Sequence, residues 1–431
     1  MTPSDLRSRL ASLGYREGIA PGQAPARPEE ERPARALPDP RRRAPAHPID
    51  SVVEGERVAT PHGECFVALQ RHPAGHPHGC YRLDDALEAD PQVLAWVGKD
   101  PRLAGLDLSR CAFLDTETTG LAGGTGTYAF LVGLGFFEGS SFVVRQLFME
   151  DYDGEEALLH ALAEALAPFA AVVSFNGKAF DLPLLDTRFS LARRPFPARG
   201  LPHLDLLFPS RRLWRDRLES CALGRLEEAF LGVERDHDVP SWAIPGIYFD
   251  YLRQGDARPL GRVFEHNRLD ILSLATLALR LARQYADPFQ PELEDGRDLC
   301  ALGAAFEDLE MPERAIPCYE RATALDIPAE VRGKAMMRLG MAYKRMRQRE
   351  DAVALWRRLA ESSRTHTLVA QLELAKHYEH VGRDYGEAER FTLQALATLE
   401  LRAARGEPWP YAQPRRELEH RLARLRRKMA R

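Results

Sequence analysis

The chain has few cysteines and no long apolar run, and each lack removes a class of protein. Six cysteines among 431 residues form no CxxC pair, which argues against a disulfide framework or a zinc ribbon and favours a reducing compartment. The longest apolar run, Tyr128 to Phe137, is too short to span a bilayer. Because the N-terminus also lacks an apolar signal core, we expect a cytoplasmic protein with no membrane partner.

The sequence also lacks an excess of basic over acidic residues. The formal net charge is −4, which excludes attraction of the whole chain to a polyanion, so nucleic-acid binding would have to come from local basic patches. Hydrophobic residues make up 45% and charged residues 28%, as in soluble globular proteins. The length allows two or three domains.

The first 49 residues differ in composition from the rest of the chain. Between Pro21 and Pro48 prolines recur every few residues and large aliphatic side chains nearly vanish. Such a stretch cannot bury enough apolar surface to offset its ordering entropy. We expect residues 1–49 to form a disordered Pro/Arg-rich arm and residues 50–109 to form a small lead-in segment with a strand at 65–69.

Residues 110–286 carry the pattern of a compact α/β domain. Five stretches rich in apolar, β-branched and aromatic residues are expected to form strands: 111–115, 127–137, 141–149, 171–175 and 203–208. The stretches in the middle of this series, on either side of a turn-like segment, predict a β-meander. A helix then starts at the acidic capping-box pattern Asp153-Gly-Glu-Glu156. Strands followed by strand–helix alternation predict a mixed five-stranded sheet with flanking helices.

From about residue 291 the pattern changes to consecutive helices with an internal repeat. Leu302-Gly303-x-x-Phe306, Leu339-Gly340-x-x-Tyr343 and Leu374-Ala375-x-x-Tyr378 open three similar units, whose first leucines are 37 and 35 residues apart. These offsets match the tetratricopeptide consensus, in which small residues allow close helix packing and aromatic residues fill the space between. We expect an all-α, tetratricopeptide-type solenoid over 291–400 and a basic capping helix over 401–431.

Two acidic residues follow an apolar strand in the segment Phe113-Leu-Asp-Thr-Glu-Thr-Thr-Gly120. Asp115 and Glu117 are two positions apart, so both carboxylates project from the same face of the strand. Carboxylates so placed repel each other unless a cation lies between them. Alone, the pair could equally be a surface feature.

Two further segments place acidic groups at the start of helices. In 172–181 a strand and an Asn-Gly turn precede Asp181, which opens a helix; an N-cap role is the alternative to metal binding for Asp181, and the two are compatible. In Glu265-His-Asn-Arg-Leu-Asp270, His266 and Asp270 are four residues apart and share a helical face. A surface ion pair would have the same spacing.

Taken together, Asp-x-Glu, Asn-x-x-x-Phe-Asp and His-x-x-x-Asp resemble the three motifs of the DEDD superfamily of 3′–5′ exonucleases, which have a ribonuclease H-like fold. The chain is similar in particular to bacterial predicted ribonuclease H-like exonucleases with C-terminal tetratricopeptide repeats. The resemblance covers about residues 50–285, and the repeats extend it. It implies that the metal ligands are Asp115, Glu117, Asp181 and Asp270, and that His266 is the general base. His266 stands four residues before Asp270, which is the spacing of the superfamily's tyrosine branch.

The resemblance also implies a mechanism. Four carboxylates in one cleft would hold two Mg²⁺ or Mn²⁺ ions, roughly 3.5–4 Å apart, that clamp the attacking and leaving oxygens. Oxygen ligands favour these hard cations over zinc. The expected function is therefore phosphodiester hydrolysis, as a 3′–5′ exonuclease on single-stranded DNA or RNA.

Two alternatives stay open at this point. One is a catalytically weak or inactive scaffold that binds nucleic acid or uses its repeats to dock a protein partner; the presence of all four carboxylates argues against it. The other is a ribonuclease H-like endonuclease, which motif spacing does not separate from an exonuclease. Asp205 is expected to have a supporting role only, and Tyr248, Phe249 and Tyr251 are expected to be core residues rather than a base-stacking surface.

Overall fold

The computed structural model describes residues 47–120, 125–236, 238–291, 294–362, 366–406 and 414–430. The expected arm lies outside the described residues up to position 46. Its last three positions were assigned wrongly, because His47 forms a backbone bridge with Asp256 and Ile49 is fully buried. None of the helices in these described ranges combines the length and apolarity that crossing a membrane requires.

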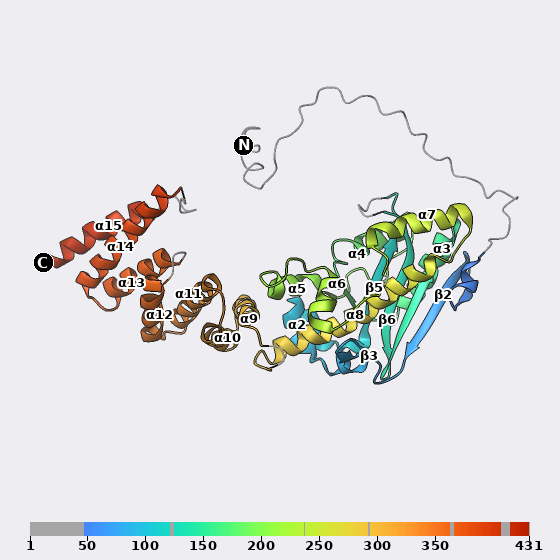
Figure 1. Ribbon diagram of the computed structural model, residues 1–431, viewed down its shortest axis with the longest axis horizontal. Coiled ribbons are helices and arrows are strands. Elements are labelled where there is room, and N and C mark those ends of the chain that lie inside the picture. Colours follow the sequence, from blue (N-terminus) through green and yellow to red (C-terminus); the bar gives the residue numbers. More distant parts are fainter. Residues whose placement is uncertain are drawn as a thin grey trace, which may run out of the picture. The chain divides into compact units, whose positions relative to one another are not determined.

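Seven strands form one mixed sheet, in the order β1-β2-β7-β6-β5-β8-β9 (Figure 1). Neighbouring strands are antiparallel except for β5–β8 and β8–β9, which are parallel. The strands are β1 (Glu56–Thr60), β2 (Gly63–His72), β5 (Cys111–Thr118), β6 (Ala129–Glu138), β7 (Ser141–Phe148), β8 (Ala171–Ser174) and β9 (His203–Asp205), and a separate hairpin comprises β3 (Pro77–His78) and β4 (Tyr81–Arg82).

The α/β class is confirmed, but the prediction of five strands was wrong. β1 and β2 belong to the stretch that was expected to form a separate lead-in segment, and β2 pairs along β7, from Phe66 opposite Phe148 to His72 opposite Phe142. Without this pairing β7 would be an edge strand, and its own sequence does not reveal these hydrogen-bond partners. The lead-in segment is therefore part of the sheet.

Helices cover both faces of the sheet. The α-helices of the α/β part are α2 (Pro91–Gly98), α3 (Glu155–Leu166), α4 (Asp181–Leu191), α5 (Leu207–Trp214), α6 (Leu223–Leu226), α7 (Ile244–Gln254) and α8 (Leu260–Ala286). Successive β5 side chains enter different cores: Phe113 packs with residues of α2 and α8, and Leu114 packs with residues of α3 and α4. In Figure 1 the long yellow helix α8 runs beside β5 and β6, which it contacts.

Two glycines on β6 let α8 approach the sheet closely. Gly133 lies opposite Asp115 in the β5–β6 register, and a Cβ atom on Gly133 would come within 2.3 Å of Asn267 Oδ1 on α8. Gly135 lies opposite Phe113, and its Cβ would come within 2.5 Å of the Ile271 side chain. Glycine is thus required here for space, since real Cβ atoms do not make such contacts.

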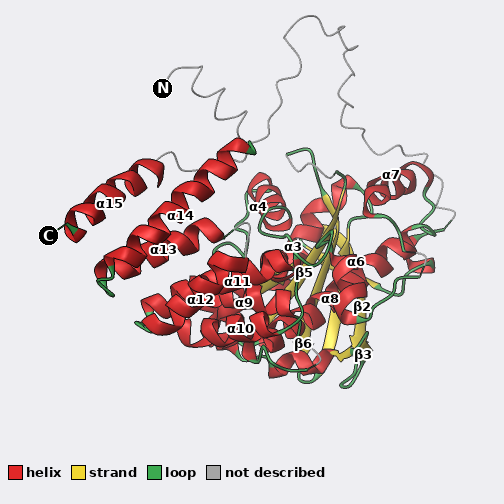
Figure 2. Ribbon diagram, turned by 60° about the vertical axis from the view of Figure 1, so that its left-hand side comes forward, coloured by secondary structure: helices red, strands yellow, loops and turns green. Residues whose placement is uncertain are grey.

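The C-terminal part is entirely helical in its described residues, as predicted (Figure 2). Its helices are α9 (Gly296–Asp308), α10 (Pro312–Ala324), α11 (Ala329–Arg345), α12 (Arg349–Ser362), α13 (Thr367–His380), α14 (Tyr385–Ala404) and α15 (Pro414–Met429). The expected packing of small residues on aromatic rings is present. A Cβ on Gly303 would lie 2.6 Å from the Tyr319 ring, and one on Gly340 would lie 2.4 Å from the Trp356 ring.

A single methyl group tests the close approach of α8. We expect Gly133→Ala to lower the free energy of unfolding by about 1–3 kcal/mol, because the buried Asn267 side chain has to move. Gly105→Ala is the matched control, since a Cβ there meets nothing within 4 Å, and its effect should stay within about 0.5 kcal/mol. Urea unfolding measures both. Equal midpoints for the two variants would contradict the packing described.

Candidate functional site

The side chains singled out from the sequence line one pocket of about 440 Å³. They come from three separate elements, with Asp115 and Glu117 on β5, Asp181 at the start of α4, and His266 and Asp270 on α8. The structure therefore brings all five together, although 155 positions separate the first from the last.

On β5 the carboxylate of Asp115 is oriented by a residue of α8. Asn267 is fully buried, and its Nδ2 donates a hydrogen bond to Asp115 Oδ2 over 2.9 Å. Its Oδ1 accepts a hydrogen bond from Gln146 Nε2 on β7, also over 2.9 Å. A register shift between Glu117 and Thr118 marks a bulge, a feature that often re-aims side chains next to active sites. Asn267 was missed by sequence reasoning, although it sits inside the third motif.

Asp181 reaches the pocket from the opposite side of β5. Its Oδ1 accepts a hydrogen bond from Thr116 Oγ1 over 2.5 Å, and Thr116 points away from its neighbours Asp115 and Glu117. Asp181 opens a helix as expected, but the alternative that it is the N-cap is wrong. Phe180 holds that position, and Asp181 is the first residue of α4. Its carboxylate accepts the hydrogen bond from Thr116 on β5 and is also hydrogen-bonded to the backbone N–H of Asp181 itself.

Asp205 holds the loop between β8 and α4 in place. Its carboxylate accepts hydrogen bonds from the backbone N–H groups of Asn176 (2.8 Å), Lys178 (3.0 Å) and Leu207 (3.1 Å). Asn176 adopts a left-handed conformation, with a φ of 67°. The supporting role expected for Asp205 agrees with these contacts, which fix the approach to Asp181.

His266 is held by a residue that the motifs do not include. Its Nδ1 lies 2.8 Å from Asp238 Oδ1, which leaves Nε2 directed at the acidic residues. Nε2 is 3.7 Å from Asp270 Oδ2 and 4.0 Å from Glu117 Oε1. When Nδ1 carries the proton donated to Asp238, Nε2 is the free base of the ring. Proximity to His266 and Arg235, against the opposing effect of burial, keeps the pKa of Asp238 below its ordinary value.

Arg235 is a cation that contacts the acidic residues of the site. It forms ion pairs with Asp270, with Glu227 (2.5 Å) and with Asp238 (3.2 Å). Burial opposes its charge, but these acidic partners raise the pKa of the guanidinium. Arg235 and Asp238 lie between a π-helical turn, Glu227–Leu231, and a short turn at Ser241–Ala243, where no periodic pattern marks them. The only sequence signal is a density of charged residues over 234–238.

Burial and mutual repulsion set the protonation of the carboxylates. Burial, followed by the charge of Asp270, raises the pKa of both Asp115 and Glu117 well above the ordinary values. Burial also raises the pKa of Asp181 to about 6, against the hydrogen bond from Thr116. An oxygen-only donor set whose members repel one another fits a hard divalent cation. Within the described ranges no three acidic, His or Cys side chains already form a metal cluster; Arg235 pairs with Asp270 instead.

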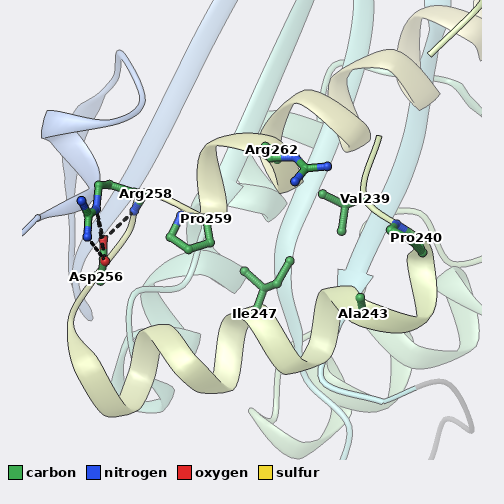
Figure 3. Close-up of a pocket in the computed structure, with 8 residues that line it drawn as sticks. All are labelled: Val239, Pro240, Ala243, Ile247, Asp256, Arg258, Pro259 and Arg262. Atoms are coloured by element: carbon green, nitrogen blue, oxygen red, sulfur yellow. Dashed lines mark hydrogen bonds and ion pairs between the residues drawn. The ribbon is translucent and has the colours of Figure 1, made fainter. Parts of the chain in front are cut away.

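The segment before α7 separates this pocket from a second cavity, of about 610 Å³ (Figure 3). Val239, Pro240 and Ala243 line the second cavity, and Arg258 pairs with Asp256 at its edge. The alternating residues Ser241, Ile244 and Pro245 line the carboxylate pocket. On α7, Tyr248 is buried and stacks on Phe130, with ring centroids 4.1 Å apart, and Tyr251 is buried too, so both are core residues as expected. Phe249 is only partly buried and belongs to neither core, so the same expectation for Phe249 was wrong.

Comparison with known proteins agrees with this geometry. A family model described as the RNase H superfamily matches residues 112–282, the segment that carries all five pocket residues. A Bacillus subtilis (strain 168) protein named "Uncharacterized protein YprB" is 30% identical over 341 residues, which cover 77% of this chain and 80% of that protein. The chain belongs to the same family as YprB, and its residues 112–282 form a domain of the RNase H superfamily. Members of this superfamily are generally nucleases, so membership indicates nuclease-type activity and a nucleic-acid substrate.

The raised pKa values predict the stability of the protein without metal. The folded state binds protons that the unfolded state releases above pH 4, so these carboxyl groups cost stability as pH rises. Each unit of pKa elevation corresponds to about 1.4 kcal/mol. In EDTA at pH 8 we therefore expect Asp115→Asn to melt a few degrees above the unsubstituted protein.

At pH 5 the difference between these two proteins should shrink, because the raised pKa of Asp115 makes a larger fraction of this carboxyl protonated than at pH 8. Asp326→Asn is the control, since its side chain is fully exposed and it should melt like the unsubstituted protein at both pH values. Differential scanning calorimetry measures the sign of the difference in melting temperature between Asp115→Asn and the unsubstituted protein. A lower melting temperature for Asp115→Asn at pH 8 would contradict the repulsion inferred here.

Proposed function

We propose that this protein is a metal-dependent nuclease of the DEDD type, acting as a 3′–5′ exonuclease on single-stranded DNA or RNA. The main support is the meeting of four carboxylates from β5, α4 and α8 in one pocket. Burial and repulsion raise the pKa of three of them, so a divalent cation would relieve a strain that the fold itself imposes.

Asp115, Glu117, Asp181 and Asp270 would hold two Mg²⁺ or Mn²⁺ ions. When bound, such ions neutralise charge on the scissile phosphate and polarise it. Asn267 and Thr116 keep two of the carboxylates oriented through their hydrogen bonds. Arg235 places a positive charge at Asp270, which reduces the repulsion among the four acidic groups before any cation binds.

His266 would accept a proton through Nε2, the ring nitrogen that faces Glu117 and Asp270. Asp238 would hold the ring in the required tautomer and balance the positive charge of the imidazolium. Asp238 thus acts through His266 and is a positioning residue. This arrangement supports His266 as general base despite its tyrosine-branch spacing.

The size of the pocket favours action at a chain end. A volume of about 440 Å³ falls in the range of small-ligand pockets, which suits a single terminal nucleotide better than a duplex. This favours the exonuclease over the ribonuclease H-like endonuclease, and the product would be a nucleotide 5′-monophosphate.

We further propose that α9 to α14 form tetratricopeptide-type repeats and that α15 caps them. Three cations of α15 converge on one buried carboxylate, that of Glu379 on α13. Arg424 Nε lies 2.6 Å and Lys428 Nζ 3.2 Å from Glu379 Oε1. Because these cations are engaged within the chain, their contacts support a capping role over phosphate binding.

Digestion of 5′-labelled single-stranded DNA, RNA and an RNA–DNA hybrid with Mn²⁺ or Mg²⁺ tests the nuclease directly. We expect a descending ladder of products from a single strand, lost on Asp115→Asn and retained by the exposed control Asp326→Asn. Internal cuts would assign the endonuclease instead. Equally faint cleavage by all three proteins would point to contamination and reject the proposal in favour of a scaffold.

His266→Gln separates a base from a metal ligand. We expect the turnover rate to fall by about 10²- to 10⁴-fold, the usual contribution of a general base. Manganese affinity, measured by calorimetric titration, should stay within a few fold, because His266 does not belong to the donor set. Asp270→Asn is the contrasting variant and should weaken manganese binding. A His266 variant that loses both properties together would show that His266 is a ligand.

A further inference from the structure

A third pocket, beside the carboxylate pocket, is rich in arginine and lysine. It has a volume of about 470 Å³ and is lined by α5 and the turn after it, and by α9 and α11. We call it the basic groove, defined by the cationic side chains Arg211, Arg212, Arg215, Arg297, Lys334 and Arg338. Only two acidic residues, Asp216 and Asp308, line it. In a chain of net charge −4 this is a local excess of positive charge.

Arg211 joins the basic groove to the carboxylate pocket, because its side chain lines both. It lies on α5 and is exposed. Within the described part of the chain, its guanidinium forms no hydrogen bond or ion pair with another residue. A cation with no partner between an acidic pocket and a basic groove is free to contact a ligand that extends from one to the other.

Several cations of the basic groove already contact other groups of the protein. The remaining cations are those that a ligand could contact. Arg212 donates to Val97 O (3.1 Å) and Arg338 pairs with Glu307 (2.8 Å), so both serve the fold. Asp308 is already paired with Lys99. Arg215 and Lys334 share one carboxylate, that of Asp216, at the loose distances of 3.7 and 3.5 Å.

Together with Arg211, therefore, three cations face a single acidic partner. Phe208, on the same wall, exposes 46% of its surface and offers an aromatic face. Cations in a row with an aromatic side chain beside them are the elements that bind single-stranded nucleic acid without sequence preference.

Buried contacts hold the two walls of the basic groove together. Asp298 on α9 is fully buried and accepts hydrogen bonds from Trp214 Nε1 (3.2 Å) and Arg217 Nη1 (2.9 Å), at and after the end of α5. Trp214 and α9 residues such as Leu302 belong to one hydrophobic core. Figure 1 shows α5 and α9 as neighbours, as their contacts require.

We propose that the basic groove binds the phosphate backbone of a single-stranded nucleic acid whose end lies in the carboxylate pocket. Arg211 would contact the strand between the two pockets, Arg215 and Lys334 would neutralise the next phosphates, and Phe208 would stack on a base. The first helices of the C-terminal part would then belong to the substrate-binding surface. This inference rests on the proposed function for its choice of ligand.

Fluorescence anisotropy with a labelled 20-nucleotide single strand, in EDTA to prevent hydrolysis, tests the groove apart from catalysis. We expect the double variant Arg215→Gln/Lys334→Gln to bind about tenfold more weakly at low salt, and its log–log salt slope to fall by about 1.4, or 0.7 for each lost contact. Arg71→Gln/Arg426→Gln is the matched control, which also removes two exposed, ion-paired cations. It should bind like the unsubstituted protein.

Equal affinity of the two double variants, both with unchanged melting temperature, would overturn the proposal. Displacement of the strand by polyglutamate at low concentration, with weak oligonucleotide binding, would assign the groove to an acidic protein partner and overturn it too. The digestion described above and this binding test can fail independently of each other. A protein that binds through the groove but cleaves nothing rejects the nuclease and keeps the groove, whereas cleavage with unaffected binding of the variant rejects the groove alone.

Discussion

Mutual repulsion of buried carboxylates is the constraint around which the α/β part is arranged. Three elements deliver four acidic side chains to one pocket, and the fold has to hold them there against their own charge. It does so with neutral donors, Asn267 and Thr116, and with the cation Arg235. The glycine opposite Asp115 has the same purpose, because only its missing side chain leaves room for Asn267. Stability is thereby given up at the place where chemistry is proposed.

The central elements of the fold follow from short-range patterns in the sequence. β5 was predictable because an apolar strand precedes Asp115, and α8 because its apolar positions recur at helical spacing. The five pocket residues were found because the three motifs keep a fixed order. The packing of Gly303 and Gly340 on aromatic rings followed from the repeat.

What the sequence did not reveal depends on contacts between distant or irregular segments. β1 and β2 join the sheet through β7, a pairing that no local pattern encodes. Arg235 and Asp238 lie in loops without periodicity, so their approach to His266 and Asp270 appears only in three dimensions. The alternative that Asp181 is the N-cap was wrong by one position, because Asp is a favoured N-cap, whereas here the hydrogen bond from Thr116 draws its carboxylate to β5.

The length of α8 has a consequence for dissecting the molecule. Its 27 residues extend over about 40 Å, from the segment that carries His266 to Tyr285, whose ring meets Phe306 of α9 edge to face. Leu281 and Tyr285 share their hydrophobic core with Leu299 and Leu302. A fragment that ends between α8 and α9 would expose the apolar side chains at this end of α8 to solvent, and such a surface promotes aggregation. The α/β part is therefore not a module that can be excised and studied alone.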